Sequence, residues 1–307
     1  MIKNIFSLTL CCLTLIVGSD VFGQSHSQST TTRQQRQLAL GPIVSSAQQV
    51  SMDAIDHSLW NAILQKYVDQ AGGVNYAALK ASSQDSAALD SYIATLSSAS
   101  MRTPASLDGQ KAYWINAYNA VTVKGILQEY PTTSIRNHTS ETGGYNIWKN
   151  LMLNVGGSQI SLDSMEHKRL RPMGDPKVHF AIVCASGGCP RLLNQAYVRE
   201  TLNAQLDANT RHFFSLPQNF QYDARTQSFK LSQIIDWFKT DFGRDQAAQL
   251  RAIAPYLPTQ AAQAAANSNA VRVSYLGYSW QLNEQVKAMA GSQPKPGSQP
   301  KPGSQSK

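Results

Sequence analysis

The chain has 307 residues, of which 42% are hydrophobic, so one large domain or two small ones with a sizeable core can form. The formal net charge is +8, but five of these charges lie in terminal stretches without compensating acids, which leaves about +3 for the central part. A charge this small, with no basic stripe interleaved with aromatic residues, argues against nucleic-acid binding.

Residues 1–23 have the pattern of a secretory signal peptide. Lys3 provides a short positive start, residues 5–17 form an apolar run, and residues 21–23 offer small or permissive residues for cleavage. The apolar run is shorter than the ~20 residues that a membrane span needs, and no later segment is apolar enough to span. We therefore predict removal of the signal near Gly23, a periplasmic or secreted location, and no membrane span.

A leader and a set of helices come next. Residues 24–52 are rich in Ser, Thr and Gln, which predicts a disordered leader before a single domain at residues 53–287. Apolar residues recur at helical spacing near residues 60–68 and 86–97. The strongest helix is predicted over residues 107–130, because its middle is apolar nearly all round, as in a central buried helix.

Two amides interrupt the apolar surface of this helix. Asn116 and Asn119 are three positions apart and therefore share a face. A buried amide costs free energy unless it is hydrogen-bonded. Two interpretations stay open: both side chains bond to neighbouring backbone, or one of them points into a site and orients a histidine or a substrate.

A hairpin and a short helix precede the middle of the chain. Residues 152–162 surround a Gly-Gly-Ser turn, which predicts a hairpin, and a helix is predicted over residues 164–171. Glu166 and His167 are adjacent on that helix and about 100° apart, so we expect one to face a site while the other supports it.

The middle of the chain holds its most informative stretch. Residues 178–184 form an almost unbroken apolar run that contains His179, which predicts a strand covered on both faces. A Gly-rich turn with Ser186 follows, and Cys189 precedes Pro190, a residue type favoured at the first position of a helix. A thiol at a helix N-terminus loses its proton more easily, so Cys189 is the candidate nucleophile.

Ordinary structural roles stay open for the same residues. A cysteine at a strand end usually packs in the core, and a histidine in an apolar run usually has a buried partner. Removal of the signal would leave Cys184 and Cys189 as the only cysteines, in an oxidising compartment. A bridge between them would close a very short loop, so its entropic stabilisation would be small.

The rest of the chain alternates helices with short strands. The predicted elements are a helix after Tyr197, a hairpin over residues 220–231, helices after Ser232 and near residues 247–257 and 259–266, and a strand over residues 271–275. Residues 288–307 repeat the motif Gly-Ser-Gln-Pro-Lys-Pro, which predicts a disordered spacer.

Four segments resemble the domain-of-unknown-function 547 family (DUF547), in the same order. They are AYWINAYNAVTVKGIL, ISLDSMEHKRLR, DPKVHFAIVCASGGCPRL and YSWQLN, and the resemblance covers roughly residues 59–283. It implies an α+β domain that is often exported in bacteria, and it implies no particular substrate. The family motif includes a Glu-His pair, a strand histidine and a Cys-Pro pair, which correspond here to Glu166, His167, His179 and Cys189-Pro190.

Several other site chemistries lack support in the sequence. No Gly-rich phosphate loop precedes a helix, no Gly-x-Ser-x-Gly elbow occurs, and none of the usual short spacings of metal ligands is present. We therefore predict no cofactor, no metal, and a small-molecule or peptide substrate. The expected fold is a mostly helical α+β domain with a central buried helix. Its small sheet includes residues 178–184, and its cysteine on a helix N-terminus is papain-like.

The leading functional hypothesis is a periplasmic thiol hydrolase, or an acyl or peptidyl transferase, that acts on an amide, ester or thioester. Cys189 is the nucleophile, His179 the general base and Glu166 the group that orients the base, while backbone N–H groups after Pro190 hold the oxyanion. His167 is the alternative base. The supporting candidates are Cys184, Asn116, Asn119 and Ser186. Two alternatives stay open: a non-catalytic periplasmic module that binds a ligand or a protein, and a thiol–disulfide protein that uses both cysteines.

Overall fold

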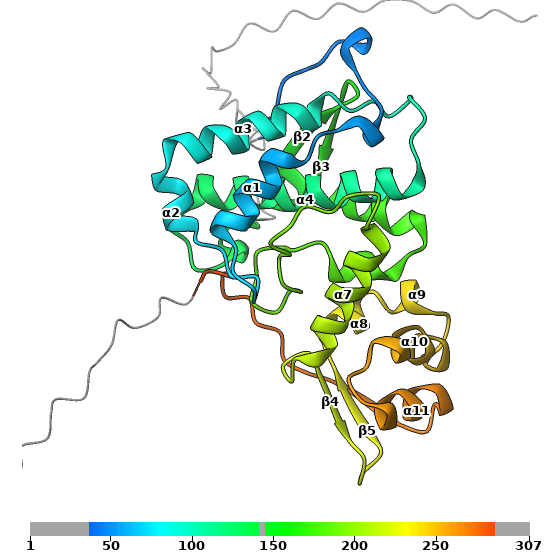
Figure 1. The fold of residues 1–307 in the computed structure, drawn as a ribbon. Coiled ribbons are helices and arrows are strands. Elements are labelled where there is room, and N and C mark those ends of the chain that lie inside the picture. Colours follow the sequence, from blue (N-terminus) through cyan, green and yellow to red (C-terminus); the bar gives the residue numbers. More distant parts are fainter. Residues whose placement is uncertain (1–36, 141–144, 286–307) are drawn as a thin grey trace, which may run out of the picture. The chain divides into compact units, whose positions relative to one another are not determined.

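The structure is a computed structural model, and it describes residues 37–140 and 145–285 (Figure 1). The predicted signal peptide, residues 1–23, the first part of the predicted leader, and the predicted tail, residues 288–307, lie outside the described residues. Within the described ranges, no helix is both long and apolar enough to cross a membrane.

The described chain has an α+β fold in which helices predominate, as the sequence predicts. Its helices are α1 Ser58–Tyr67, α2 Tyr76–Ala81, α3 Ser83–Ser97, α4 Leu107–Glu129, α5 Ile147–Asn150, α6 Leu162–Met165, α7 Leu202–Ser215, α8 Gln233–Trp237, α9 Lys239–Phe242, α10 Gln246–Ile253 and α11 Gln260–Ser268. Its strands are β1 Leu38–Leu40, β2 Leu151–Val155, β3 Ser158–Ser161, β4 Phe220–Asp223, β5 Ser228–Leu231 and β6 Arg272–Tyr275.

The strands form two small sheets of the same type. In each sheet an antiparallel hairpin, β2–β3 or β4–β5, is extended by a strand that joins it in parallel. The hairpins confirm the sequence prediction, and the register of the first pairs Leu153 with Ile160. Each hairpin leads directly into a helix whose first turn is capped by a serine, Ser161 for α6 and Ser232 for α8.

Part of the predicted leader is ordered, which corrects the prediction of disorder over its described residues. Strand β1 pairs in parallel with β2, and the backbone of Val50 is bonded to Ser98 and Ser100. The leader can pair in this way because it contains a short apolar segment, in which Leu40 is buried against the first core. A composition dominated by Ser, Thr and Gln concealed this three-residue strand.

Helix α4 is the centre of the first core, as its apolar sequence predicts. Ser106 caps its N-terminus by accepting a hydrogen bond from the N–H of Gly109. Side chains are buried on every face of its middle, and α3 packs alongside it (Figure 1). A helix enclosed in this way is rigid, so polar side chains on it are held in fixed positions.

A second core is built largely from phenylalanines. It lies between α7, the hairpin β4–β5 and helices α8 to α11 and includes Phe180, Phe213, Phe214, Phe220 and Phe229. Phe180 ends the 3₁₀ helix Pro176–Phe180, whose other residues include Val178 of the first core. This short 3₁₀ helix therefore joins the two cores.

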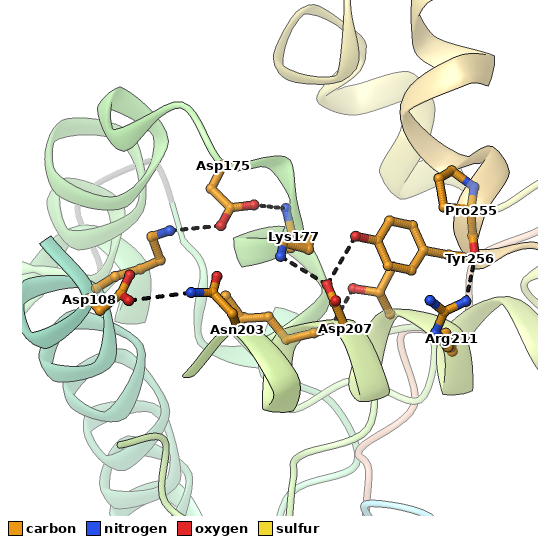
Figure 2. Close-up of polar contacts among 11 residues, drawn as sticks. Asp108, Asp175, Lys177, Asn203, Asp207, Arg211, Pro255 and Tyr256 are labelled. Carbon is orange, nitrogen blue, oxygen red and sulfur yellow. Dashed lines mark hydrogen bonds and ion pairs between the residues drawn. The ribbon is translucent and has the colours of Figure 1, made fainter. Parts of the chain in front are cut away.

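Polar contacts fasten the same 3₁₀ helix from both sides (Figure 2). On one side, the Nζ of Lys111 in α4 lies 2.7 Å from the carboxylate of Asp175, and both side chains are largely buried. On the other side, the Nζ of Lys177 lies 2.9 Å from Asp207 in α7, which also accepts a hydrogen bond from Tyr256. These ion pairs fix the chain just before the two cysteines.

The predicted strand over residues 178–184 is wrong. Asp175 accepts a hydrogen bond from the N–H of Lys177, and Pro176 occupies the first helical position, so the chain begins a 3₁₀ helix there. Burial explains the apolar run equally well in either conformation, because an apolar run alone does not distinguish a strand from a buried helical segment. The Asp-Pro start signal decided the conformation.

The predicted helix after Cys189 is also wrong. Residues 190–200 contain no helix, and the next one, α7, begins at Leu202. The papain-like placement of a cysteine on a helix N-terminus is therefore absent, and a helix dipole cannot be what activates Cys189.

Candidate active site

A cleft of about 620 Å³ brings together most of the site residues predicted from the sequence. Among its lining residues are Glu166, His167, His179, Cys184 and Cys189. The volume lies within the range of small-molecule sites. Asn116, Asn119 and Ser186 do not line the cleft, although the hydroxyl of Ser186 contacts the sulfurs of both cysteines.

Hydrogen-bond donors surround the sulfur of Cys189. It lies 3.2 Å from the backbone N–H of Cys184, 3.3 Å from the hydroxyl of Ser186 and 3.1 Å from that of Tyr278. The two hydroxyls are 2.7 Å apart. One hydroxyl therefore donates to the sulfur, and the second hydroxyl donates to the oxygen of the one that does. No imidazole is among the described hydrogen-bond partners of this sulfur.

These donors favour the thiolate form of Cys189. Burial by itself would raise the pKa of this thiol, but hydrogen bonds from Cys184 and from the linked hydroxyls of Ser186 and Tyr278 outweigh burial and lower the pKa to about 6. Burial raises the pKa of the Tyr278 hydroxyl, which therefore stays protonated and remains a donor. Cys189 is half-buried at the cleft surface, so an activated thiolate there is accessible.

Cys184 is the neutral partner of this thiolate. Its sulfur lies 2.7 Å from that of Cys189, and both cysteines are free. The hydrogen bond to Cys189, together with burial, raises the pKa of Cys184 well above its ordinary value. The two thiols therefore differ in acidity, and hydrogen bonds rather than the predicted helix N-terminus produce the difference.

The C-terminal segment holds the turn between the cysteines. Ser186 forms an antiparallel bridge with Leu282, and the N–H groups of Gly187 and Gly188 bond to the carbonyls of Gln281 and Ser279. The N–H of Cys189 closes the turn onto Ser186. These three N–H groups are therefore occupied and are not free to stabilise an oxyanion.

Close approach at Gly188 allows Tyr278 to reach the sulfur. A Cβ atom added at Gly188 would lie 2.7 Å from the Tyr278 ring, closer than side chains normally approach. Ala185, in the same turn, has a φ of 60°, a left-handed conformation that disfavours residues other than glycine. Strained backbone held by surrounding bonds is common where a chain positions reactive groups.

The two asparagines of α4 bond to backbone, which confirms the structural interpretation. Asn116 donates to the carbonyl of Tyr197 at 2.7 Å and accepts from the N–H of the same residue at 3.0 Å. Asn119 donates to the carbonyl of Ala181 and accepts from the N–H of Val183, each at 2.9 Å. Asn119 thus makes the backbone hydrogen bonds that a neighbouring strand would otherwise make to residues 181–183.

Glu166 and His167 both line the cleft, but they differ in burial. Both lie in the π-helical turn Glu166–Leu170, which follows α6. Glu166 lines the cleft 3.5 Å from the hydroxyl of Tyr118. Burial raises the pKa of its carboxyl group to about 7, with the charge of Cys189 adding to the effect. His167 is exposed and meets the ring of Phe238 at its edge.

The carboxylate that bonds to His179 is that of Asp241, which the sequence analysis missed. The Nε2 of His179 lies 2.8 Å from Asp241, whose two oxygens also accept hydrogen bonds from Arg171 at 2.6 and 2.8 Å. Burial lowers the pKa of His179, and the hydrogen bond from Arg171 lowers that of Asp241 to about 2. Glu166 has no described bond to His179, so its predicted orienting role is corrected.

An aromatic wall forms another part of the cleft. We use this name for Trp148, Trp237, Tyr278 and Trp280, whose rings contact one another and line the cleft. Within the described ranges, no three His, Cys, Asp or Glu side chains form a group that could hold a metal ion.

Comparison with known proteins finds a family match over part of the chain but points to no function. Residues 103–214 match the model of a family described as "Protein of unknown function, DUF547", which confirms the resemblance seen in the sequence. The matched part contains Glu166, His179 and both cysteines, whereas Asp241 and Tyr278 lie beyond it. No curated protein and no solved structure matches the chain.

Proposed function

We propose that this chain of the DUF547 family is a thiol hydrolase or acyl transferase with Cys189 as its nucleophile. The substrate class is an amide, ester or thioester of a peptide or small metabolite. One observation carries the proposal: the Cys189 sulfur is surrounded by donors that lower its pKa to about 6, at the surface of a cleft that also holds a carboxyl group. A thiolate is the nucleophilic form of cysteine.

The reaction follows from the protonation states of the cleft. The Cys189 thiolate attacks the carbonyl carbon, and a carbon–sulfur bond forms as the carbonyl oxygen becomes an oxyanion. Once the sulfur is bonded to carbon, it no longer carries the negative charge that its donors stabilise. The Tyr278 hydroxyl then becomes free to stabilise the oxyanion. This hydroxyl takes the place of the backbone donors that the turn cannot supply.

Proton transfer falls to the acidic groups of the same cleft. Glu166, whose carboxyl group has a pKa raised to about 7, gives its proton to the leaving group as the carbon–leaving-group bond breaks. Water or an acceptor then attacks the acyl-enzyme, loses a proton to the Glu166 carboxylate, and releases the Cys189 thiolate. His179, neutral and held by Asp241, is the second candidate for accepting that proton, and His167 is the third.

A burst experiment tests the proposal without knowledge of the natural substrate. With 4-nitrophenyl acetate in excess, the wild type should release one nitrophenolate per chain rapidly, and intact mass should show one acetyl group on Cys189. The Cys189→Ala variant should show neither, whereas Cys184→Ser, which keeps a donor beside the sulfur, should retain the burst. A burst of equal size in Cys189→Ala would overturn the assignment. Thiols that react slowly and equally in the wild type would favour the non-catalytic binding module.

A second candidate function rests on one specific observation. The two sulfurs lie 2.7 Å apart, and one is acidic while the other is not, as a thiol–disulfide protein requires. In that case a substrate disulfide would oxidise the pair, with loss of two hydrogens from the chain and gain of two by the substrate. Equilibration in glutathione buffers, followed by acid quenching and mass analysis, separates the two functions. A pair that stays reduced at the glutathione potential of an oxidising compartment excludes the redox function.

A further inference from the structure

The proposed reaction leaves two features of the cleft without a role, the tryptophans of the aromatic wall and a pair of cationic side chains. The wall begins at the reacting atom, because Tyr278 contacts Cys189 through its hydroxyl and Trp280 through its ring, at a centroid distance of 4.7 Å. Trp237 continues the wall, with its ring stacked on Trp280 at 5.8 Å and an interplanar angle of 26°.

The wall exposes apolar surface that a ligand could cover. Trp237 is 46% exposed, although tryptophan is on average one of the more buried residue types. Large rings exposed in a cleft favour a flat ligand, because stacking adds to the gain from removing both surfaces from water. The body of the ligand is therefore expected to be a planar ring system.

The cations lie at the same wall. The guanidinium carbon of Arg136 is 5.3 Å from the centre of the Trp280 ring, and Lys149 follows Trp148 in α5 and also lines the cleft. Among the described ion pairs, neither cation has a carboxylate partner, in contrast to Arg171, which is bonded to Asp241 through both oxygens.

The acidic groups of the cleft do not neutralise these cations. Asp163 and Glu166 line the same cleft, but neither is within ion-pair distance of Arg136 or Lys149 in the described structure. A planar fork such as guanidinium is suited to a carboxylate, and its stacking on Trp280 fixes its orientation in advance.

We infer that the substrate is an acyl compound with a planar ring system and an anionic group, in which the ring stacks on Trp237 and Trp280 and the anion pairs with Arg136 and Lys149. The acyl assignment rests on the proposed function, whereas the ring and the anion rest on the wall and the cations alone. Tyr278 links the two parts, because it belongs to the wall and contacts the nucleophile.

Calorimetric titration of the full chain with two matched probes tests the inference. Naphthalene-2-carboxylate and naphthalene-2-carboxamide have the same ring and differ in charge. We expect the carboxylate to bind roughly fivefold more tightly at low salt, as one half-exposed charge-assisted contact provides. This preference should disappear in Arg136→Gln combined with Lys149→Gln, and should persist in the control Arg225→Gln, which changes an exposed cation in the β4–β5 turn.

The ring contribution is tested separately. Trp237→Leu should weaken both probes by the same factor, whereas Trp280→Leu also removes the ring that orients Arg136 and should weaken binding of the carboxylate more than that of the carboxamide. Equal affinity for the two probes in the wild type, or a preference that survives the double substitution, would overturn the inference. A lost nitrophenyl burst with intact probe preference would instead refute the proposed function and leave the ligand class standing.

Discussion

The hydroxyl oxygen of Tyr278 lies 3.1 Å from the sulfur of Cys189, although 89 positions separate the two residues in the chain. The segment after β6 produces this contact, because it pairs with the turn between the cysteines and carries Tyr278 over it. Activation of the thiol therefore depends on a tertiary contact and not on the local helix that the sequence predicts.

Substitution of Tyr278 by Phe should make Cys189 a weaker acid. The change removes one donor to the thiolate while keeping the ring, so we expect the pKa of Cys189 to rise by roughly 1–2 units. The pH dependence of iodoacetamide labelling, followed by peptide mass analysis, measures it. Tyr275→Phe is the matched control, because this tyrosine is partly exposed and its hydroxyl has no described contact with either cysteine. An unchanged titration in Tyr278→Phe would show that the other donors suffice.

The elements of this fold were largely predictable, because they are specified locally. The apolar pattern of α4, both hairpins and the serine caps before α6 and α8 all lie within short windows of sequence. The conformation of residues 178–184 was not predictable, because a buried strand and a buried helical segment have the same apolar sequence pattern. The Asp175-Pro176 pair was the signal that could have indicated the 3₁₀ helix.

Most residues of the site could be predicted from the sequence, but the contacts between them could not. Glu166, His179 and Cys189 do share one cleft, to which a π-helical turn, a 3₁₀ helix and the Gly-rich turn bring them. Asp241 and Tyr278, which bond to the imidazole and to the sulfur, come from later segments with no motif in common with them. Which carboxylate meets which base is decided by tertiary packing, and no sequence spacing records it.

Removal of the Asn119 side chain should destabilise the fold rather than the chemistry. Asn119→Ala leaves the N–H of Val183 and the carbonyl of Ala181 buried without their partner, at an expected cost of about 1–3 kcal/mol. Urea unfolding measures this loss. Asn203→Ala, which removes an exposed hydrogen bond of 3.3 Å to Asp108, should have an effect within about 0.5 kcal/mol. A fully stable Asn119→Ala variant that loses thiol reactivity would place Asn119 in the site.

The ion pair of Asp241 with Arg171 and its hydrogen bond to His179 should stabilise the fold at neutral pH, and this stabilisation should be lost in acid. The folded-state pKa of Asp241 is about 2, below its ordinary value of 3.8, so its contribution is complete above pH 3.8 and is lost as the pH falls towards 2. Asp241→Asn should therefore be less stable than the wild type at pH 6, and this difference should shrink at pH 3. Urea unfolding at both values checks it, and a constant difference would show that the carboxylate charge is irrelevant.

Export stays a prediction from residues 1–23, which lie outside the described structure. Protein purified from its native host should begin near Gln24, because signal cleavage is expected after residues 21–23. N-terminal sequencing of that protein is the measurement. A chain that still begins at Met1 would remove the argument for an oxidising compartment, and with it much of the support for a redox role of Cys184 and Cys189.

Glu166 offers a test in which the role predicted from the sequence and the structure lead to opposite expected effects of Glu166→Gln on folding stability. As the partner of a protonated base, it would be an anion, and Glu166→Gln would then destabilise the fold at neutral pH. In the structure burial raises the pKa of this carboxyl group from 4.5 to about 7, so the fold favours its neutral form. A group of this kind loses stabilisation as the pH rises from 4.5 through 7, because ionisation remains easy in the unfolded chain.

Glu166→Gln keeps a neutral side chain of similar size at every pH. Relative to the wild type, the variant should therefore gain stability between pH 4.5 and 7, by an amount on the order of 1–2 kcal/mol, and keep that gain above pH 7. Glu129→Gln, at a carboxyl group outside the cleft, is the matched control and should show no such gain. The same Glu166→Gln protein should react normally with iodoacetamide, which needs no proton donor, yet turn over 4-nitrophenyl acetate more slowly after the burst. A variant that is less stable than the wild type at pH 8 would mean that Glu166 acts as a charged partner, and the proton donor would have to be sought at His167 or His179.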